Sequence, residues 1–490
     1  MKKNIIITIG ILLLLSGCNN WLNLKPEDDR VSDQYWTSEE DVQTTLNSCY
    51  NRFRNCIPYF VIWGEIRAEN LNVVSLDATA DIELIHGQDI TSENEWIQWA
   101  TFYKVINSAN SVIKYAPEVL KKDPLYTEDE MKLDIAEARG LRGLAYYYLV
   151  RAFREVPLVT EPFVSDEYGY VMAKSPEDTI WNLVTEDLYA ALSLPNTHTT
   201  NNSEIWQNKC RLTGWGAATI LAEVYLWTGQ YSLSKELCEL IIKSNKYELE
   251  TDWFRNFYPG MTDESIFELY FDGANSQNNS LFSWFNFNNT SHYYEINSSL
   301  PQEYDDMDER GEGTTFVSSK SCLWKYLGTG TANTSAGNTR PSNNRSPNWI
   351  FYRYADVFLI HAEACAMLPA PDYESAVNSL NEVRTRAGLT GLSTTDAYTQ
   401  ESFLTLLLDE RRKEFVGEGK RWFDLLRLAR IDNFSKFKTM VVNILLKNIS
   451  LNERPIYQTK LSKTGSFYFP INKDDIDRSG GLLIQNEAYQ

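Results

Sequence analysis

The residues before Cys18 indicate a specific modification of this cysteine. Cys18 follows two small residues and the almost unbroken apolar run Ile5–Leu15, which two lysines precede. This run is too short to span a bilayer, which needs about 20 residues, and it is typical of a signal peptide. Small residues before a cysteine are typical of a bacterial lipobox, in which the cysteine is lipidated after cleavage. The sequence predicts a lipoprotein signal peptide at 1–17 and a lipidated tether at 18–37. The alternative is an ordinary signal peptide with an incidental cysteine.

A second candidate for chemistry is the charged run from Glu410 to Arg427, in which acids and arginines alternate. On a helix, Glu410 and Glu414 lie four residues apart, as do Glu414 and Glu418, a spacing that favours ion pairs with neighbouring cations. Acids and arginines gathered in a cleft could also bind or transform a ligand. We interpret the run as a structural network, and we interpret three arginines of an earlier helix in the same way: Arg139, Arg142 and Arg151.

The segment from Tyr304 to Arg310 is unusually acidic. Its aspartates could supply oxygen ligands to a calcium ion, although the spacing, the glycine and the final glutamate of an EF-hand are missing. These candidate ligands are Asp305, Asp306 and Asp308. The alternative is a turn in which Asp308 and Arg310 form structural pairs.

The sequence lacks the motifs that are typical of zinc sites, hydrolases and nucleotide-binding enzymes. The four histidines are scattered and no HExxH motif occurs, so a zinc site is not predicted. The sequence has no GxSxG, P-loop or dinucleotide motif, and nothing among its acids selects the carboxylate pair of a glycosidase. We expect no cofactor, whereas the 66 acids leave a glycosidase pair open as an alternative. Six cysteines besides Cys18 form no CxxC motif, and no pairing is assigned: Cys49, Cys56, Cys210, Cys238, Cys322 and Cys365.

Charge and aromatic content narrow the class of ligand. The formal charge of the 490-residue chain is −20, and it becomes −22 without the two lysines of the signal peptide. Such a chain repels phosphate backbones and, without a local basic patch, anionic glycans. Aromatic residues make up 13% of the chain, against only 4 histidines. An excess of flat, uncharged rings suits a neutral ligand with flat faces, and sugars are the obvious class.

Aromatic residues set among asparagines are the candidates for sugar binding. Pyranose rings present C–H faces that stack on aromatic rings, and flanking amides hydrogen-bond the hydroxyl groups. The cluster at 282–294 is the preferred site, with further candidates from two other regions: Trp284, Phe285, Tyr293, Tyr294, Trp324, Asn286, Asn288, Trp63 and Trp96. For each aromatic residue taken singly, core packing is the alternative.

Helical periodicity dominates the elements that must position these residues. Two consecutive pairs of helices are predicted in the middle of the chain, at 213–227 with 232–243 and at 349–367 with 372–387. In each pair two small residues lie twelve apart, Ala222 and Ser234 in the first, Ala364 and Ala376 in the second. Small residues at this spacing allow close packing, as in tetratricopeptide repeats, although generic helical hairpins remain the alternative.

Two earlier helix pairs are predicted as further units, namely 39–54 with 95–115 and 131–153 with 177–192. Between about 247 and 348 helical periodicity disappears and Asn, Ser, Thr and Gly predominate. We therefore predict a mostly α fold, with a tetratricopeptide-like helical-hairpin scaffold and large irregular loop-rich insertions. Residues 38–490 form a single domain in this interpretation, and the insertion carries the ligand site.

Ten short segments spread over the whole chain together resemble the sequence pattern of one protein family. These segments are Trp21–Pro26, Tyr35–Trp36, Ser38–Glu40, Trp99–Asn110, Ala136–Tyr148, Val156–Val159, Arg353–Ala364, Glu410–Arg427, Tyr468–Ile471 and Gln485–Tyr489. Arg353–Ala364 and Glu410–Arg427 are the most specific of these. With this series the chain resembles the SusD/RagB family of nutrient-binding outer-membrane lipoproteins.

The resemblance implies a lipoprotein on the cell surface, at the outer membrane, that binds its ligand without transforming it. Such proteins act as a lid on a SusC-like TonB-dependent transporter and deliver oligosaccharides, from polysaccharides such as starch, to that partner. RagB-like relatives capture peptides or proteins instead, and this is the alternative function. Nucleic acid is not an expected partner.

Overall fold

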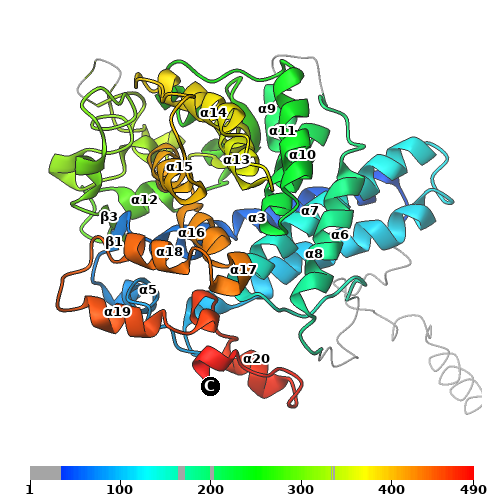
Figure 1. Ribbon diagram of the computed structural model, residues 1–490. Coiled ribbons are helices and arrows are strands. Elements are labelled where there is room, and N and C mark those ends of the chain that lie inside the picture. The colour runs from blue at the N-terminus through cyan, green and yellow to red at the C-terminus, as the bar shows by residue number, and fades with distance from the viewer. Residues whose placement is uncertain (1–34, 164–171, 199–203, 333, 335–336) are drawn as a thin grey trace, which may run out of the picture.

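Helices make up most of the structure, a computed structural model that describes residues 35–163, 172–198, 204–332, 334 and 337–490 (Figure 1). The predicted mostly α class is confirmed. No helix among these residues combines the length and the apolar character needed to cross a bilayer. Cys18 and most of the predicted tether lie outside the described residues. Its last residues, Tyr35 and Trp36, belong to the folded part, where Trp36 stacks on Tyr115 at 5.0 Å between ring centroids.

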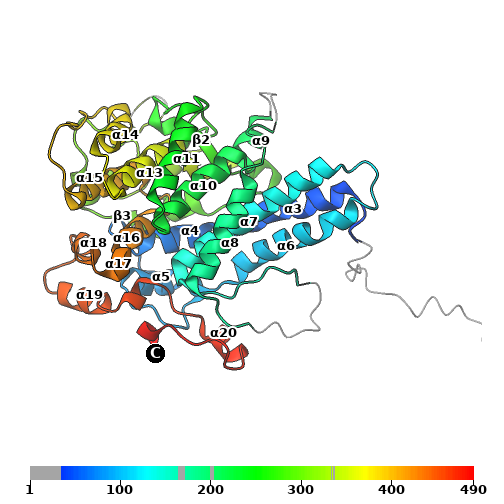
Figure 2. The same ribbon diagram turned by 45° about the vertical axis from the view of Figure 1, so that its right-hand side comes forward.

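Four long helices form the first part of the scaffold: α3 (Glu39–Arg54), α6 (Ala100–Val119), α7 (Glu128–Phe153) and α8 (Glu177–Ala191). Each packs against the next, and Figure 2 shows α3, α6 and α7 side by side. Ser38 and Thr127 begin α3 and α7 with capping boxes. The predicted helix 95–115 begins later than expected, because residues 95–97 form a separate 3₁₀ turn.

The two middle hairpins continue the stack. The helices α10 (Gly214–Trp227) and α11 (Tyr231–Lys243) form one hairpin, and α13 (Tyr354–Met367) and α14 (Tyr373–Arg386) form the other. All four small residues of the twelve-residue spacing are fully buried, and Ser234 Oγ donates to the carbonyl of Ala222 at 2.8 Å. Since α8 packs on α10 and α11 on α13, the predicted tetratricopeptide-like scaffold is confirmed as one continuous helical stack.

Two helix predictions were wrong in part. Residues 349–353 are not helical but form strand β4 (Trp349–Arg353), which pairs with β2 (Ser265–Leu269) in antiparallel register. Both strands are fully buried, so their sequences lack the alternation that marks a strand, and apolar periodicity cannot separate them from a buried helix. The charged run 410–427 is likewise divided, because Gly417 and Gly419 adopt positive φ between two helices.

The remaining elements are shorter and surround the stack. They comprise α4 (Ile57–Val61) with the π-helix Ile62–Ile66, β1 (Leu71–Val73), α5 (Ala80–His86), α9 (Ile205–Cys210), α12 (Leu281–Phe285), β3 (Tyr294–Ile296), α15 (Gln400–Phe415), α16 (Arg421–Ala429), α17 (Ile431–Phe434), α18 (Lys438–Leu445), α19 (Arg454–Lys460) and α20 (Lys473–Arg478). Strands β1 and β3 form a second antiparallel pair. Between 247 and 348 the described chain consists mainly of turns and single 3₁₀ turns around β2, α12 and β3.

A close approach of two backbones joins the N-terminal and C-terminal parts of the chain. Gly64 in the π-helix lies against Gly419 in the turn before α16, and a Cβ at Gly64 would come within 1.8 Å of the Gly419 carbonyl oxygen. Gly419 itself has φ +69°, a conformation that favours glycine. The two glycines therefore fix how the π-helix sits on the charged run.

Replacing Gly64 with alanine tests this contact. We expect Gly64→Ala to lower the free energy of unfolding by about 3 kcal/mol, because the added methyl group meets backbone that cannot move aside. Urea denaturation followed by tryptophan fluorescence measures the change. Gly229→Ala is the control, since its Cβ would meet nothing within 4 Å and only backbone strain of about 1–2 kcal/mol applies. Equal losses in the two variants would contradict the close approach.

Candidate ligand-binding site

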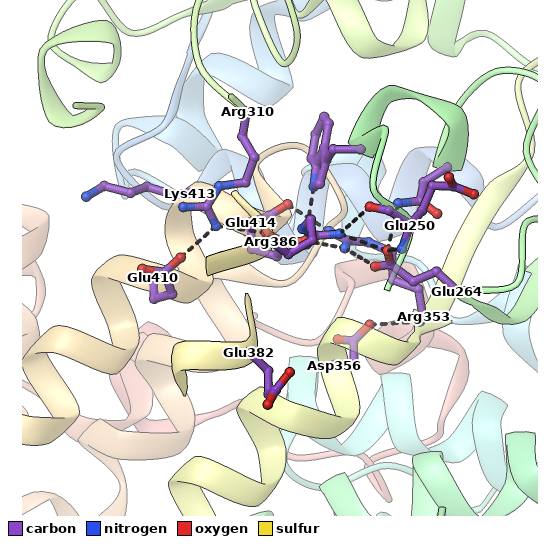
Figure 3. Close-up of polar contacts among 12 residues, drawn as sticks. Glu250, Glu264, Arg310, Arg353, Asp356, Glu382, Arg386, Glu410, Lys413 and Glu414 are labelled. Carbon is purple, nitrogen blue, oxygen red and sulfur yellow. Dashed lines mark hydrogen bonds and ion pairs between the residues drawn. The ribbon is translucent and has the colours of Figure 1, made fainter. Parts of the chain in front are cut away.

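The charged run 410–427 forms a buried ion-pair network with arginines from other elements (Figure 3). Arg353, at the end of β4, lies between three carboxylates. Its guanidinium group contacts Glu264 at 2.7 Å and Glu418 at 3.1 Å, and it also pairs with Glu414. All four side chains are at most 1% exposed. This network is inside the fold and not on a ligand-accessible surface.

Glu414 pairs with three arginines from separate parts of the chain. Arg310 contacts it at 2.8 Å, Arg353 and Arg386 pair with it, and Trp253 Nε1 donates to it at 3.0 Å. Burial alone would raise the pKa of Glu414, but the surrounding guanidinium groups hold it well below its usual value. Glu414 is therefore a permanently ionised structural acid rather than a general acid or base.

The remaining charges of the run are paired in the same way. Arg421 contacts Glu69 at 2.5 Å, and Asp424 contacts Arg411 at 2.8 Å and Arg427 at 3.0 Å. The arginines of α7 are also structural: Arg139 and Arg142 contact Asp187, and Arg151 lies over the rings of Tyr147, Tyr148 and Phe423. The interpretation of both segments as structural networks is confirmed, although most partners come from distant elements.

The acidic segment 304–310 does not gather its aspartates around a cation site. Both oxygens of Asp308 accept from Arg310, at 2.8 and 2.7 Å, and Asp308 is buried, whereas Asp305 and Asp306 are exposed. No group of three potential metal ligands occurs among the described residues. The calcium candidate is therefore wrong for Asp308, and the alternative turn with an Asp308–Arg310 pair is what the structure contains.

Each of the six cysteines after Cys18 is buried as a free thiol. Burial raises the pKa of each of these thiols; for Cys322 it rises to about 11. They are therefore unreactive core residues.

The predicted aromatic cluster comes together around Tyr294. Trp284 stacks in parallel on Tyr293, with 6.0 Å between ring centroids and 17° between planes, and both contact Tyr294. Phe285 packs between Tyr294 and Tyr326. The chain from Trp284 to Tyr293 forms a closed loop, because the Tyr293 N–H donates to the Trp284 carbonyl at 2.9 Å. We call residues 284–293 the Tyr293 loop.

Several of the predicted site residues are inaccessible. Phe285, Tyr294 and Trp63 have no exposed surface, and Trp324 is 3% exposed with its Nε1 donating to the carbonyl of Gly330. In this structure these four rings cannot present a face to a ligand, so they belong to the core, the alternative considered for each of them. Trp63 and the partly exposed Trp96 lie in a separate aromatic group with Tyr59.

The accessible part of the predicted site is the surface of the Tyr293 loop. Tyr293 and Asn286 are partly exposed and Asn288 is exposed, whereas Trp284 supports the Tyr293 ring from beneath at 8% exposure. Asn286 also shapes the loop, because its side-chain oxygen accepts from the Asn288 N–H at 3.3 Å. The loop thus offers the Tyr293 ring together with amide groups from the same loop.

Two residues that the sequence analysis did not select extend this surface. Phe287 lies in the same loop and is partly exposed, and the exposed Lys320 places its Nζ 4.5 Å from the Phe287 ring centroid and 5.7 Å from that of Trp324. Phe287 could have been found from its position between the two candidate asparagines. Lys320 could not, because it lies 33 positions after Phe287, beyond strand β3 and mostly irregular chain.

The chain is similar to known proteins over most of its length. The sequence model of the SusD family matches residues 245–489. SusD-like protein P38 of Formosa agariphila is 26% identical over 480 residues, which cover 87% of this chain and 91% of that protein. A solved SusD superfamily protein from Bacteroides vulgatus superposes with a TM-score of 0.75 at 22% identity, covering 93% of this chain and 100% of the other. Surface glycan-binding protein A from Bacteroides thetaiotaomicron, solved in complex with laminarihexaose, superposes with a TM-score of 0.70 at 20% identity, covering 92% and 100%.

Glu414 provides a test of the buried network. We expect Glu414→Gln to lower the free energy of unfolding by about 3–5 kcal/mol, because three arginines lose their shared buried counter-charge. Thermal and urea denaturation measure the loss. Glu128→Gln is the matched control, since its pair with Lys132 at 2.8 Å is exposed and should leave the denaturation midpoint unchanged. A midpoint for Glu414→Gln equal to that of the control would refute the structural role.

Proposed function

This chain belongs to the SusD family, and on that premise we propose that it is a cell-surface lipoprotein that captures glycans and delivers them to a SusC-like TonB-dependent transporter. It acts by binding and not by catalysis. The lipid on Cys18 holds it at the outer membrane, where the transporter is its partner. Family membership supports the kind of role, and the chain's own surface supports the class of ligand.

The observation that carries the glycan assignment is the Tyr293–Trp284 stack. Tyr293 rests on the nearly buried Trp284 and keeps part of its ring exposed. A ring fixed from beneath loses little conformational freedom when the C–H face of a sugar stacks on it. Asn286 and Asn288, in the same loop, supply amide groups that can donate to and accept from sugar hydroxyls.

Two solved proteins with this fold bear names that support a glycan as ligand. One is the Bacteroides thetaiotaomicron protein in complex with laminarihexaose, and the other is described as a laminarin-binding SusD-like protein. Both ligands are neutral glucans, which fits the charge of −20 on this chain, because an anionic glycan would be repelled. We therefore propose neutral oligosaccharides as the preferred ligands.

Lys320 favours a second candidate, the capture of peptides by a RagB-like subunit of the same kind of transporter. Its exposed ammonium group beside Phe287 could pair with a peptide carboxylate. Calorimetric titration with casein-derived peptides and with neutral oligosaccharides, in parallel, separates the two. If the protein releases heat of binding with peptides but not with oligosaccharides, peptides replace glycans as the proposed ligand.

The Tyr293 ring can be tested directly. We expect Tyr293→Ala to raise the Kd for the bound glycan about two- to tenfold, since a stacking contact contributes about 0.5–1.5 kcal/mol. Affinity gel electrophoresis on laminarin and starch, followed by titration with laminarihexaose and maltohexaose, gives the change. Tyr294→Phe is the neighbouring control, because its buried hydroxyl group has no partner among the described residues and its loss should not alter binding. Unchanged affinity in Tyr293→Ala would remove this loop from the site.

Anchoring has its own test at Cys18. We expect Cys18→Ser, expressed in the native host, to lose labelling by radioactive palmitate and to leave the membrane fraction, because serine lacks the thiol that carries the lipid. The wild-type protein and the buried-cysteine variant Cys49→Ser are the comparisons, and both should remain in the membrane fraction. Continued lipid labelling of Cys18→Ser would show that the anchor lies elsewhere.

A further inference from the structure

We propose that the groove between α3, α9 and the chain that follows β2 is a second saccharide-binding site, separate from the Tyr293 loop. The inference rests on the proposed function for the class of ligand. The groove has a volume of about 630 Å³, within the range of about 300–1,000 Å³ that small-molecule sites occupy. Its lining has an aromatic wall and a polar wall.

Trp206 and Tyr270 form the aromatic wall. Their rings are stacked, with 6.2 Å between centroids and 24° between planes, and both line the groove. Trp206 is 41% exposed although it is one of the largest apolar side chains. Tryptophan in the folded chain is usually buried for the most part, so an exposed indole lining a cleft indicates a surface that a ligand covers.

The polar wall is one face of α3. Thr44, Asn47 and Asn51 recur at intervals of three and four residues, so they lie along the same side of the helix, and all three are exposed and line the groove. Leu46 and Phe53, on the other side of α3, are buried in the core. The polar side of the helix is therefore held toward the groove. Amide and hydroxyl groups in a row along a helix can follow the hydroxyl groups of a sugar chain.

Arg54 joins the two walls by hydrogen bonds. Its Nε donates to the Tyr270 carbonyl at 2.9 Å, and its Nη1 donates to Asn51 Oδ1 at 3.4 Å. Arg54 also interacts with the opposite charge of Asp272, which lines the same groove. Arg211, the second cation of the groove, is paired with Glu137 at 2.7 Å. The charges are balanced, so the groove suits a neutral ligand rather than an anion.

Gln277 adds a further amide side chain to the polar lining of the groove. The aromatic rings and the polar side chains together match what a saccharide needs: a ring face to stack on and partners for its hydroxyl groups.

The groove and the Tyr293 loop lie in different parts of the molecule. In Figure 1, α9 lies beside α10 and α11 at the top, whereas α12 lies with β1 and β3 on the left. Two separate sites on one protein raise the overall affinity for a long polysaccharide that can occupy both, even if each site binds a short oligosaccharide modestly.

The test is fluorine NMR on the full-length protein labelled with 5-fluorotryptophan. The ligands are a panel of laminarin, laminarihexaose, starch and maltohexaose. The Trp206 resonance is identified by its loss in Trp206→Phe. We expect the glycan that the protein binds to shift this resonance, and we expect the shift to persist in Tyr293→Ala because the groove is independent of that loop. In titrations, Trp206→Ala should raise the Kd for the polysaccharide about tenfold, and Trp206→Ala with Tyr293→Ala should abolish binding.

Tyr189→Ala is the matched control for the titrations, since Tyr189 is an aromatic residue of α8 that is 67% exposed and should leave the affinity unchanged. If the wild-type protein binds a glycan but the Trp206 resonance does not move and Trp206→Ala binds normally, the groove is not a saccharide site and the proposed function stands. If no glycan of the panel binds, both proposals fail. A Trp206 shift with casein-derived peptides alone would also overturn the assignment to saccharides.

Discussion

The rest of the structure depends on the burial of Glu414 among Arg310, Arg353 and Arg386. These cations come from the irregular insertion, from β4 and from α14, so one carboxylate of α15 holds three separate parts of the chain. Removing charges from water is expensive, and the fold recovers that cost only because each guanidinium group meets oxygen atoms in good geometry. Breaking the network is costly, because the remaining partners would be left buried without a counter-charge.

This constraint matters most for the insertion that carries the Tyr293 loop. Irregular chain has no ladder of backbone hydrogen bonds to determine its path, so its side chains must attach it to the scaffold. Arg310 does so through Glu414, and Lys325 through Glu418 at 2.9 Å, while Tyr326 donates to the Gly417 carbonyl. Because Tyr326 also packs on Phe285, the aromatic cluster beneath Tyr293 is held in place by the same network.

Local patterns predicted the scaffold well, and the site only in part. The spacing of Ala222 and Ser234 identified a hairpin, because contacts within a hairpin depend on residues close in sequence. The strand at 349–353 was missed, because a strand buried on both faces has the same apolar run as a buried helix. Among the site candidates, sequence could not separate Tyr293, which is partly exposed, from its neighbour Tyr294, which is not. Their exposure is decided by the pairing of β3 with β1, a strand more than 200 residues earlier in the chain.

The sequence by itself determined the mostly α class and the helical hairpins, since each follows from composition or from short-range spacing. It also predicts a lipoprotein signal around Cys18 and a structural role for the charged run. Only the tertiary structure decided which aromatic rings face solvent and which acid each arginine meets. It also brought Trp206, Asn51 and Tyr270 to one groove. These features depend on contacts between residues far apart in the chain, and the energy of such contacts comes from burial and desolvation, which no local pattern records.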